Sequence, residues 1–327
     1  MKKVISFLLI ISICLCFCGC DNKDKVLYMS YNDFNNVNAI IDSSTGNSSN
    51  EQLFASNVCV VPLGQDNGGD DKLTGKAEIL VNVTDNTICY ADNIYEKLYP
   101  ASITKIMTTL TALKHSDLDA VVEVSTNSGG ITESGAKLCK LKKGQKIVLR
   151  DLITAMLTYS GNDAGIEVAN FVAGSVEEFA KLMNQDAKEL GCVSTNFVNP
   201  HGLHDDNHYT TAYDLYLIYN ELLKYDFFLE ASSRVSFDMP YTDTNGKAKS
   251  SKYDNTNSYI IGTMSPPEGI IVTGGKTGTT IKAGKCLAVS CTDSDNKQYV
   301  AIVLYACDMS SDLLYTQMNE LLSQFKK

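Results

Sequence analysis

The feature that most restricts the fold of this chain is the order of its secondary-structure patterns, with strands at both ends of the globular part and helices between them. Near the beginning, residues 77–83 and 87–90 are β-prone and flank Asp85-Asn86, a combination typical of a β-hairpin. Three more β-prone segments lie near the end, at residues 269–273, 286–291 and 299–305. This order predicts one α/β domain, whose antiparallel sheet is completed by both chain ends and carries a mostly helical insertion. We expect the functional site where this insertion meets the sheet.

The middle of the chain and its end carry apolar residues at helical spacing. Five helices are expected, near residues 102–114, 152–157, 175–190, 211–222 and 313–325. The third begins with the capping box Ser175-Val176-Glu177-Glu178 and stops at Gly191.

The first twenty residues differ in composition from the rest. Lys2-Lys3 precede a mostly apolar run at residues 4–17, and polar residues follow Gly19-Cys20. This pattern predicts an export signal in residues 1–20. Because Gly19-Cys20 resembles a lipoprotein processing site, we expect Cys20 to carry a lipid that attaches the N-terminus to the extracytoplasmic face of the membrane. An ordinary cleaved signal and an uncleaved anchor are the alternatives.

Residues 21–75 have the composition of a polar linker, rich in Asn, Ser, Asp and Gly. Within them, residues 58–61 are β-prone and form a possible added strand. The folded domain is then expected to occupy residues 76–327. The formal charge of −10 argues against a nucleic-acid partner, which requires a positive surface.

Neither the cysteines nor the histidines predict a metal site. The seven cysteines beyond the export segment are scattered and include no C-x-x-C pair, so a zinc site is not expected, while a disulfide remains open. Three histidines and two acids lie close together in one loop, at His201, His204, Asp205, Asp206 and His208. The loop gives them no common face, so we interpret them as structural and expect no cofactor.

Three short motifs follow one another along the chain: Ser102-x-x-Lys105, Ser160-x-Asn162 and Lys276-Thr277-Gly278. Ser-x-x-Lys also begins at three other serines, where we interpret it as chance: Ser134, Ser294 and Ser323. The ordered set is therefore more informative than any single member.

Ser102 and Lys105 lie three residues apart, on one face of the first expected helix. A serine hydroxyl becomes a good nucleophile when a neighbouring base takes its proton. Lys105 can be that general base if burial and a second cation lower its pKa, and we expect Lys276 to be that cation. The start of the helix after Pro100-Ala101 leaves a backbone N–H free to bind an oxyanion.

The other two motifs suit the handling of a substrate. The Ser160 hydroxyl can relay a proton between Lys105 and a leaving amine, and the Asn162 amide can bind a substrate carbonyl and fix the lysine. Residues 276–279 are expected on a strand at the edge of the cleft, where Gly278 lets a peptide approach the backbone closely. Lys276 and Thr277 suit a terminal carboxylate, and the Thr279 N–H is a second oxyanion donor.

With their neighbours, these motifs resemble the D-alanyl-D-alanine carboxypeptidases of the low-molecular-mass penicillin-binding proteins. The resemblance rests on residues 100–108, 160–164, 195–203, 210–215 and 276–280. It extends from about residue 76 to 327 and implies the fold of penicillin-binding transpeptidases and serine β-lactamases. Many members carry a second β-rich domain and a C-terminal anchor, whereas this chain stops after the helix at 313–325, so attachment is expected at the N-terminus. Residues 255–257, ahead of the third motif, match only in part.

The resemblance implies a peptidoglycan stem peptide ending in D-Ala-D-Ala as substrate. Ser102 would be acylated by the penultimate D-Ala, the terminal D-Ala released and the acyl-enzyme hydrolysed, and β-lactam antibiotics would acylate the same serine. A serine β-lactamase is one alternative, disfavoured because no Glu-x-x-x-Asn stretch lies between Asn162 and Lys276. A non-catalytic penicillin-binding or scaffold protein is another, disfavoured because all the expected catalytic residues are present. An endopeptidase would use the same residues as a carboxypeptidase.

Overall fold

The computed structural model describes residues 58–61, 71–307 and 309–326, which belong to one compact unit of the chain. The predicted export signal, the expected lipidation site Cys20 and most of the predicted linker lie outside these ranges. No helix in the described ranges has the length and apolar character needed to cross a membrane.

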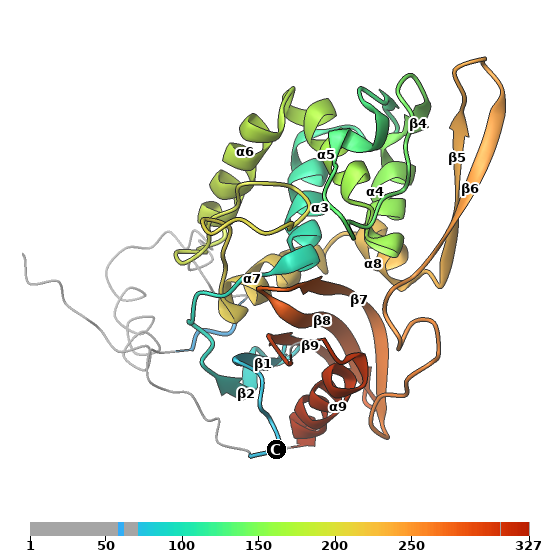
Figure 1. Cartoon of the computed structure of the whole chain (residues 1–327). Coiled ribbons are helices and arrows are strands. Elements are labelled where there is room, and N and C mark those ends of the chain that lie inside the picture. Colours follow the sequence, from blue (N-terminus) through green and yellow to red (C-terminus); the bar gives the residue numbers. More distant parts are fainter. Residues whose placement is uncertain (1–57, 62–70, 308, 327) are drawn as a thin grey trace, which may run out of the picture. The chain divides into compact units, whose positions relative to one another are not determined.

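A five-stranded antiparallel sheet lies between helix α9 on one face and a layer of helices on the other (Figure 1). Its strand order is β2-β1-β9-β8-β7. The strands are β1 (Ala77–Asn82), β2 (Thr87–Asp92), β7 (Ile270–Thr280), β8 (Gly284–Asp293) and β9 (Gln298–Leu304). Strand β1 pairs with β9, so that Leu80 lies opposite Ala301 and the two ends of the domain meet in the sheet. The predicted fold, a sheet completed from both ends around a helical insertion, is confirmed.

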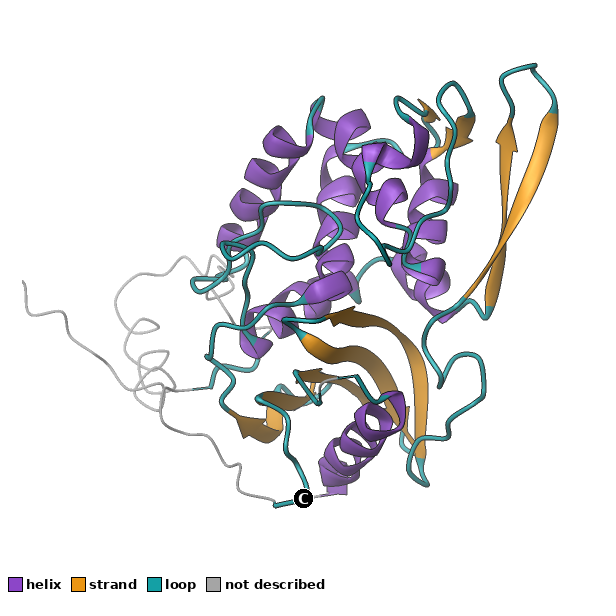
Figure 2. Ribbon diagram, in the orientation of Figure 1, coloured by secondary structure: helices purple, strands orange, loops and turns teal. Residues whose placement is uncertain are grey.

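Most of the regular secondary structure between β2 and β7 is helical (Figure 2). The α-helices are α3 (Thr104–His115), α4 (Leu149–Tyr159), α5 (Asn162–Ala173), α6 (Val176–Glu189), α7 (Ala212–Leu222), α8 (Asp226–Ser233) and α9 (Ser311–Leu322). The N-cap predicted at Ser175 is confirmed, because the Ser175 hydroxyl accepts the Glu178 N–H at 3.1 Å. Gly191, with φ of 88°, follows α6 in the left-handed conformation that glycine favours.

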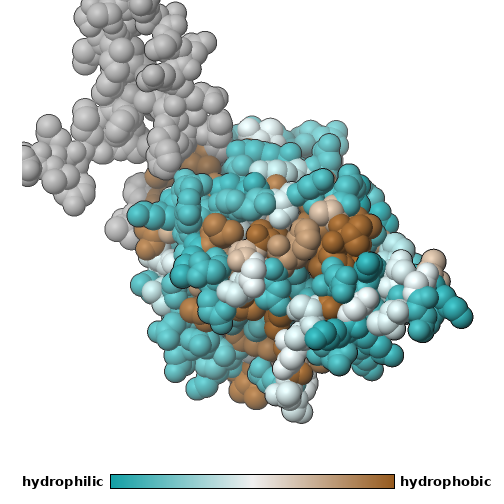
Figure 3. All heavy atoms as spheres, turned by 90° about the horizontal axis from the view of Figure 1, so that it is seen from above, coloured by the Kyte–Doolittle hydropathy of each residue, from teal (hydrophilic) through white to brown (hydrophobic). Residues whose placement is uncertain are grey.

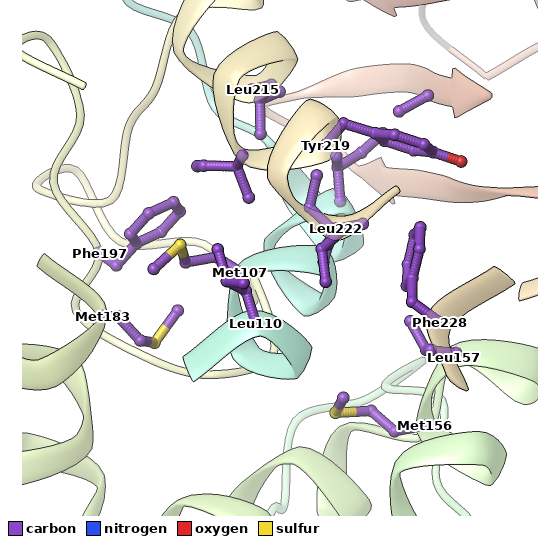
Figure 4. Packing of buried hydrophobic residues seen from close by; sticks show 14 of the residues in the cluster. Met107, Leu110, Met156, Leu157, Met183, Phe197, Leu215, Tyr219, Leu222 and Phe228 are labelled. Carbon is purple, nitrogen blue, oxygen red and sulfur yellow. The ribbon is translucent and has the colours of Figure 1, made fainter. Parts of the chain in front are cut away.

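Alternation along β1 divides the apolar side chains between two cores. Ile79 and Val81 join the larger core, under the helices, and Leu80 joins the core that α9 covers. Side chains from six helices, α3 to α8, fill the larger core, among them Met107, Met156, Met183, Leu215 and Phe228 (Figure 4). The face seen from above is mostly hydrophilic, with separate hydrophobic patches between the polar side chains (Figure 3).

A second, smaller sheet is present that the sequence did not predict. It has the order β3-β4-β5-β6 and consists of β3 (Val121–Glu123), β4 (Lys146–Val148), β5 (Ser236–Thr242) and β6 (Ala248–Asp254). Strands β5 and β6 form a long hairpin beside α4 (Figure 1). Most side chains of β6 are exposed and polar, which leaves no alternation of apolar residues to recognise.

The added strand predicted at residues 58–61 is wrong. These residues are not in a strand and are bound to α7 by hydrogen bonds instead. The Cys59 N–H donates to the Tyr216 hydroxyl at 2.9 Å, and the Tyr213 hydroxyl donates to the Cys59 carbonyl at 2.9 Å. Side-chain hydroxyls on the helix thus satisfy the backbone groups that a neighbouring strand would otherwise have paired.

Candidate active site

A cleft of about 760 Å³ lies where the helical insertion meets the edge strand β7. Its walls come from β7, the short helix η1 (Ala101–Ile103), the turn between α4 and α5, and a loop at residues 133–137. All three motifs contribute to its lining, through Ser102, Ser160, Asn162, Thr277 and Thr279.

Close backbone packing holds Ser102 in place. Ala101, directly before it, has φ of 48°, a left-handed conformation that is costly for a residue with a Cβ. A Cβ on Gly202 would lie 1.8 Å from the Ala101 carbonyl oxygen, and one on Gly278 would lie 2.8 Å from that of Pro100. Because glycine alone permits both approaches, the loop at Gly202 and strand β7 together clamp the backbone that carries the serine.

Lys105 lies on the first turn of α3 and its side chain is completely buried. Its amine donates to the Ser102 hydroxyl at 2.9 Å, to the Asn162 side-chain oxygen at 2.7 Å and to the His201 carbonyl at 2.7 Å. The contact expected from the Ser-x-x-Lys spacing is therefore confirmed. The Asn162 and His201 oxygens hold the amine beside the hydroxyl that it would deprotonate.

Burial and positive neighbours favour the neutral form of Lys105. Burial is the larger cause that holds the pKa of this amine well below its usual range, and the charge of Lys276 follows. Asp163 acts in the opposite direction and Lys137 in the same one. Lys276 is itself buried, and burial together with the charge of Lys137 lowers its pKa to about 7. The direction of this pKa shift agrees with the influence expected of Lys276.

Ser160 and Asn162 occupy the turn between α4 and α5. Ser160 has φ of 70° and ends α4, and Asn162 begins α5. A Cβ on Gly161 would lie 2.3 Å from the Cys139 sulfur, so glycine is required between them. The Asn162 side chain holds Lys105, whereas the acceptors of the Lys105 amine do not include Ser160.

On β7, the threonines rather than the lysine face the cleft. Lys276 is only 1% exposed, and its amine donates to the Thr277 carbonyl at 3.0 Å behind the cleft wall. The Thr277 hydroxyl lies 2.6 Å from that of Thr256, which also lines the cleft. Thr256 belongs to the segment that matched only in part and is a site residue that sequence reasoning did not assign.

Lys137 is a second residue that sequence reasoning missed. The Ser134-x-x-Lys137 pattern was interpreted as chance, yet both residues line the cleft. The Lys137 amine lies 4.5 Å from the centre of the Tyr159 ring, and its carbonyl accepts the Asn162 N–H at 2.8 Å. Its position depends on contacts with a turn more than twenty residues away, which no local spacing indicates.

The clustered histidines have separate structural partners. His208 lies 2.7 Å from the Thr104 hydroxyl and accepts the Val198 N–H at 3.1 Å. His201 accepts the Leu203 N–H at 3.1 Å. His204 lies on the surface of the loop, 3.2 Å from Asp206. The three rings thus serve different parts of the loop that supports Ser102 and Lys105.

Comparison with solved structures places the fold among penicillin-interacting enzymes. The chain superposes on the Streptomyces K15 DD-transpeptidase with a TM-score of 0.70 at 23% identity, covering 79% of this chain and 98% of that one. It superposes on penicillin-binding protein D2 of Listeria monocytogenes, solved in its ampicillin-bound form, with a TM-score of 0.64 at 25% identity. That match covers 79% of this chain and all of the other.

Sequence comparison gives the family. The chain is 33% identical over 234 residues to D-alanyl-D-alanine carboxypeptidase DacF of Bacillus subtilis and 31% identical over 239 residues to DacC of Escherichia coli. Both matches cover 71% of this chain, but only 57% and 56% of the relatives' own length. A model of the D-alanyl-D-alanine carboxypeptidase family, peptidase S11, matches residues 65–307. This chain belongs to that family.

Proposed function

We propose that the protein is a serine-type D-alanyl-D-alanine carboxypeptidase that removes the terminal D-Ala from peptidoglycan stem peptides. The observation that carries this proposal is the Lys105 amine, buried, 2.9 Å from the Ser102 hydroxyl and low in pKa. A neutral lysine so placed is a base for a serine nucleophile.

In the proposed acylation, Lys105 takes the proton of Ser102 while the serine oxygen attacks the carbonyl carbon of the penultimate D-Ala. The backbone N–H groups of Ser102 and Thr279 would bind the developing oxyanion, since both residues line the cleft. The carbon–nitrogen bond then breaks, and a proton passes from Lys105 through Ser160 to the departing amine.

In the proposed deacylation, water enters the cleft after D-Ala has left. Lys105 takes a proton from the water as its oxygen attacks the Ser102 ester, and the serine recovers its hydroxyl hydrogen. Asn162 keeps the lysine in place through both steps, as its 2.7 Å contact with the amine suggests.

The proposed substrate contacts come from β7. The Thr277 and Thr279 side chains line the cleft and suit hydrogen bonds to the peptide. Gly278 brings the strand close to η1, and Lys276 supplies positive potential from behind the wall. The same arrangement would accept a β-lactam, in keeping with the ampicillin bound to the Listeria relative.

The proposal is tested with a peptide ending in Lys-D-Ala-D-Ala and an assay for free D-Ala. Wild-type protein should release D-Ala and bind a fluorescent penicillin covalently, and Ser102→Ala should abolish both. Ser134→Ala, which changes the other Ser-x-x-Lys serine in the cleft, should retain both. Labelling that survives in Ser102→Ala would refute the assignment, and a wild-type protein that releases no D-Ala would favour a non-catalytic penicillin-binding protein.

The lifetime of the penicillin adduct separates this function from that of a β-lactamase. Glu133 is the sole acidic residue among the described residues lining the cleft, and it is exposed on the loop. Because the leaving group of an opened β-lactam stays tethered to the adduct, and no carboxylate is positioned to activate water, we expect the adduct on Ser102 to persist in intact-mass spectra. Rapid turnover of a chromogenic cephalosporin would instead support a β-lactamase, with Glu133→Gln as the next variant.

We also propose that the protein is exported and held at the extracytoplasmic face of the membrane by a lipid on Cys20. Support comes from the composition of residues 1–20 and from the location of peptidoglycan outside the membrane. Fatty-acid labelling should be present in the wild type and absent in Cys20→Ala. Equal labelling of the two proteins would exclude Cys20 as the attachment site.

A further inference from the structure

Three lysines lie close enough for their charges to influence one another, and they differ in their access to the cleft. Lys105 and Lys276 are buried, with 0% and 1% of their surface exposed. Lys137 is exposed and lines the cleft. Its ammonium lies over the Tyr159 ring, and its carbonyl holds the N–H of Asn162. The exposed amine is thus fixed beside the turn that carries the second motif.

This positive charge has no partner within the described part of the chain. None of the three lysines takes part in an ion pair with a described carboxylate, although lysines elsewhere on the surface do. Asp163, the buried acid nearby, accepts three backbone N–H groups instead, from Cys139, Leu141 and Ala164. Lys137 and Lys276 thus form a positive group without a carboxylate counter-ion among the described residues, which indicates a site that an anionic ligand completes.

We propose that Lys137 is a specificity residue, whose ammonium binds the C-terminal carboxylate of the peptide that acylates Ser102. The proposal rests on the carboxypeptidase function proposed above. Lys276 is the other candidate for this contact, but its amine is buried and donates to the Thr277 carbonyl. Lys276 would therefore act on the carboxylate through its field, and Lys137 through a direct charge-assisted hydrogen bond.

Lys137 can contact the terminal carboxylate only until the terminal D-Ala has left the site. The carboxylate belongs to the D-Ala that departs, so it leaves the site once the carbon–nitrogen bond breaks. Lys137 should therefore affect kcat/KM, because this constant covers the steps up to acylation. The effect should require a free carboxylate at the C-terminus of the peptide. A peptide whose C-terminus is an amide presents no charge and should gain little from the lysine.

The test compares Lys137→Met with wild type on two peptides that differ only at the C-terminus, one ending in D-Ala-D-Ala and the other in D-Ala-D-Ala amide. The measured quantity is the ratio of the two kcat/KM values, acid over amide. We expect this ratio to fall about tenfold to 100-fold in Lys137→Met, the range for a charge-assisted hydrogen bond. Lys137→Arg should retain most of the preference.

Lys282→Met is the matched control, because Lys282 is another exposed lysine that lines the cleft. The ratio of kcat/KM for the acid to kcat/KM for the amide should be the same in Lys282→Met as in the wild type. The proposal would be overturned if the ratio were unchanged in Lys137→Met, or if it fell in Lys282→Met but not in Lys137→Met. Either result would leave the carboxypeptidase function intact. A wild type that cleaves neither peptide at the bond between the two D-Ala residues would overturn both.

Discussion

Replacing Asn162 by Asp would put a carboxylate 2.7 Å from the Lys105 amine, where an amide oxygen now lies. The two side chains have the same shape, so the packing at the start of α5 is retained. The new negative charge favours the protonated form of Lys105 and raises its pKa. Because acylation requires the neutral amine, the acid limb of the pH–rate profile should move to higher pH.

The distance sets the size of this shift. Opposite unit charges 2.7 Å apart attract by about 6 kcal/mol at an effective dielectric constant of 20. Burying the carboxylate offsets part of this attraction, which leaves roughly 3–4 kcal/mol, or about 2–3 pKa units. At pH values below both inflections, acylation should therefore be about 100-fold to 1000-fold slower than in the wild type.

The assay is the second-order rate constant of labelling by a fluorescent penicillin, measured across the pH range. Asn170→Asp is the matched control, since it makes the same change near the far end of α5, where the Asn170 amide contacts Ser125. Its profile should not move. A profile for Asn162→Asp that is lower but not displaced would show that Lys105 is not the group whose ionisation controls acylation.

The parts of the fold predicted from the sequence are those with a strong local pattern. The β-hairpin at residues 77–90 and the capping box at Ser175 each depend on neighbours a few residues apart. Strand β7 extends from Ile270 to Thr280 and so joins the β-prone segment at 269–273 to the cleft-edge strand expected at 276–279, because its glycines interrupt the apolar pattern but not the pairing with β8. Helix α5 was missed because Ser160-Gly161-Asn162 is typical of a turn, and a second helix begins at its last residue.

In the candidate site, too, only contacts between residues close in sequence could be predicted. Ser102 and Lys105 are one helical turn apart, so their contact followed from spacing alone. Lys137 reaches the site only because its carbonyl pairs with Asn162 and its amine lies over Tyr159. Such contacts join segments that are distant in sequence, and their geometry follows from the packed fold rather than from any local pattern.

Two further predictions concern the backbone around the cleft. Gly278→Ala would place a Cβ 2.8 Å from the Pro100 oxygen, about 0.6 Å closer than an ordinary contact. Strand β7 must therefore move, and penicillin labelling should slow by up to about 100-fold. A labelling rate within about threefold of the wild-type rate would contradict this prediction. Asp163→Ala would leave the buried N–H groups of Cys139 and Leu141 without their acceptor, at 2.7 and 3.0 Å. Each buried donor left unpaired costs about 1–3 kcal/mol, so the free energy of unfolding, measured in urea, should fall by about 2–6 kcal/mol. A loss below about 1 kcal/mol would show that water or a rearranged loop replaces the carboxylate.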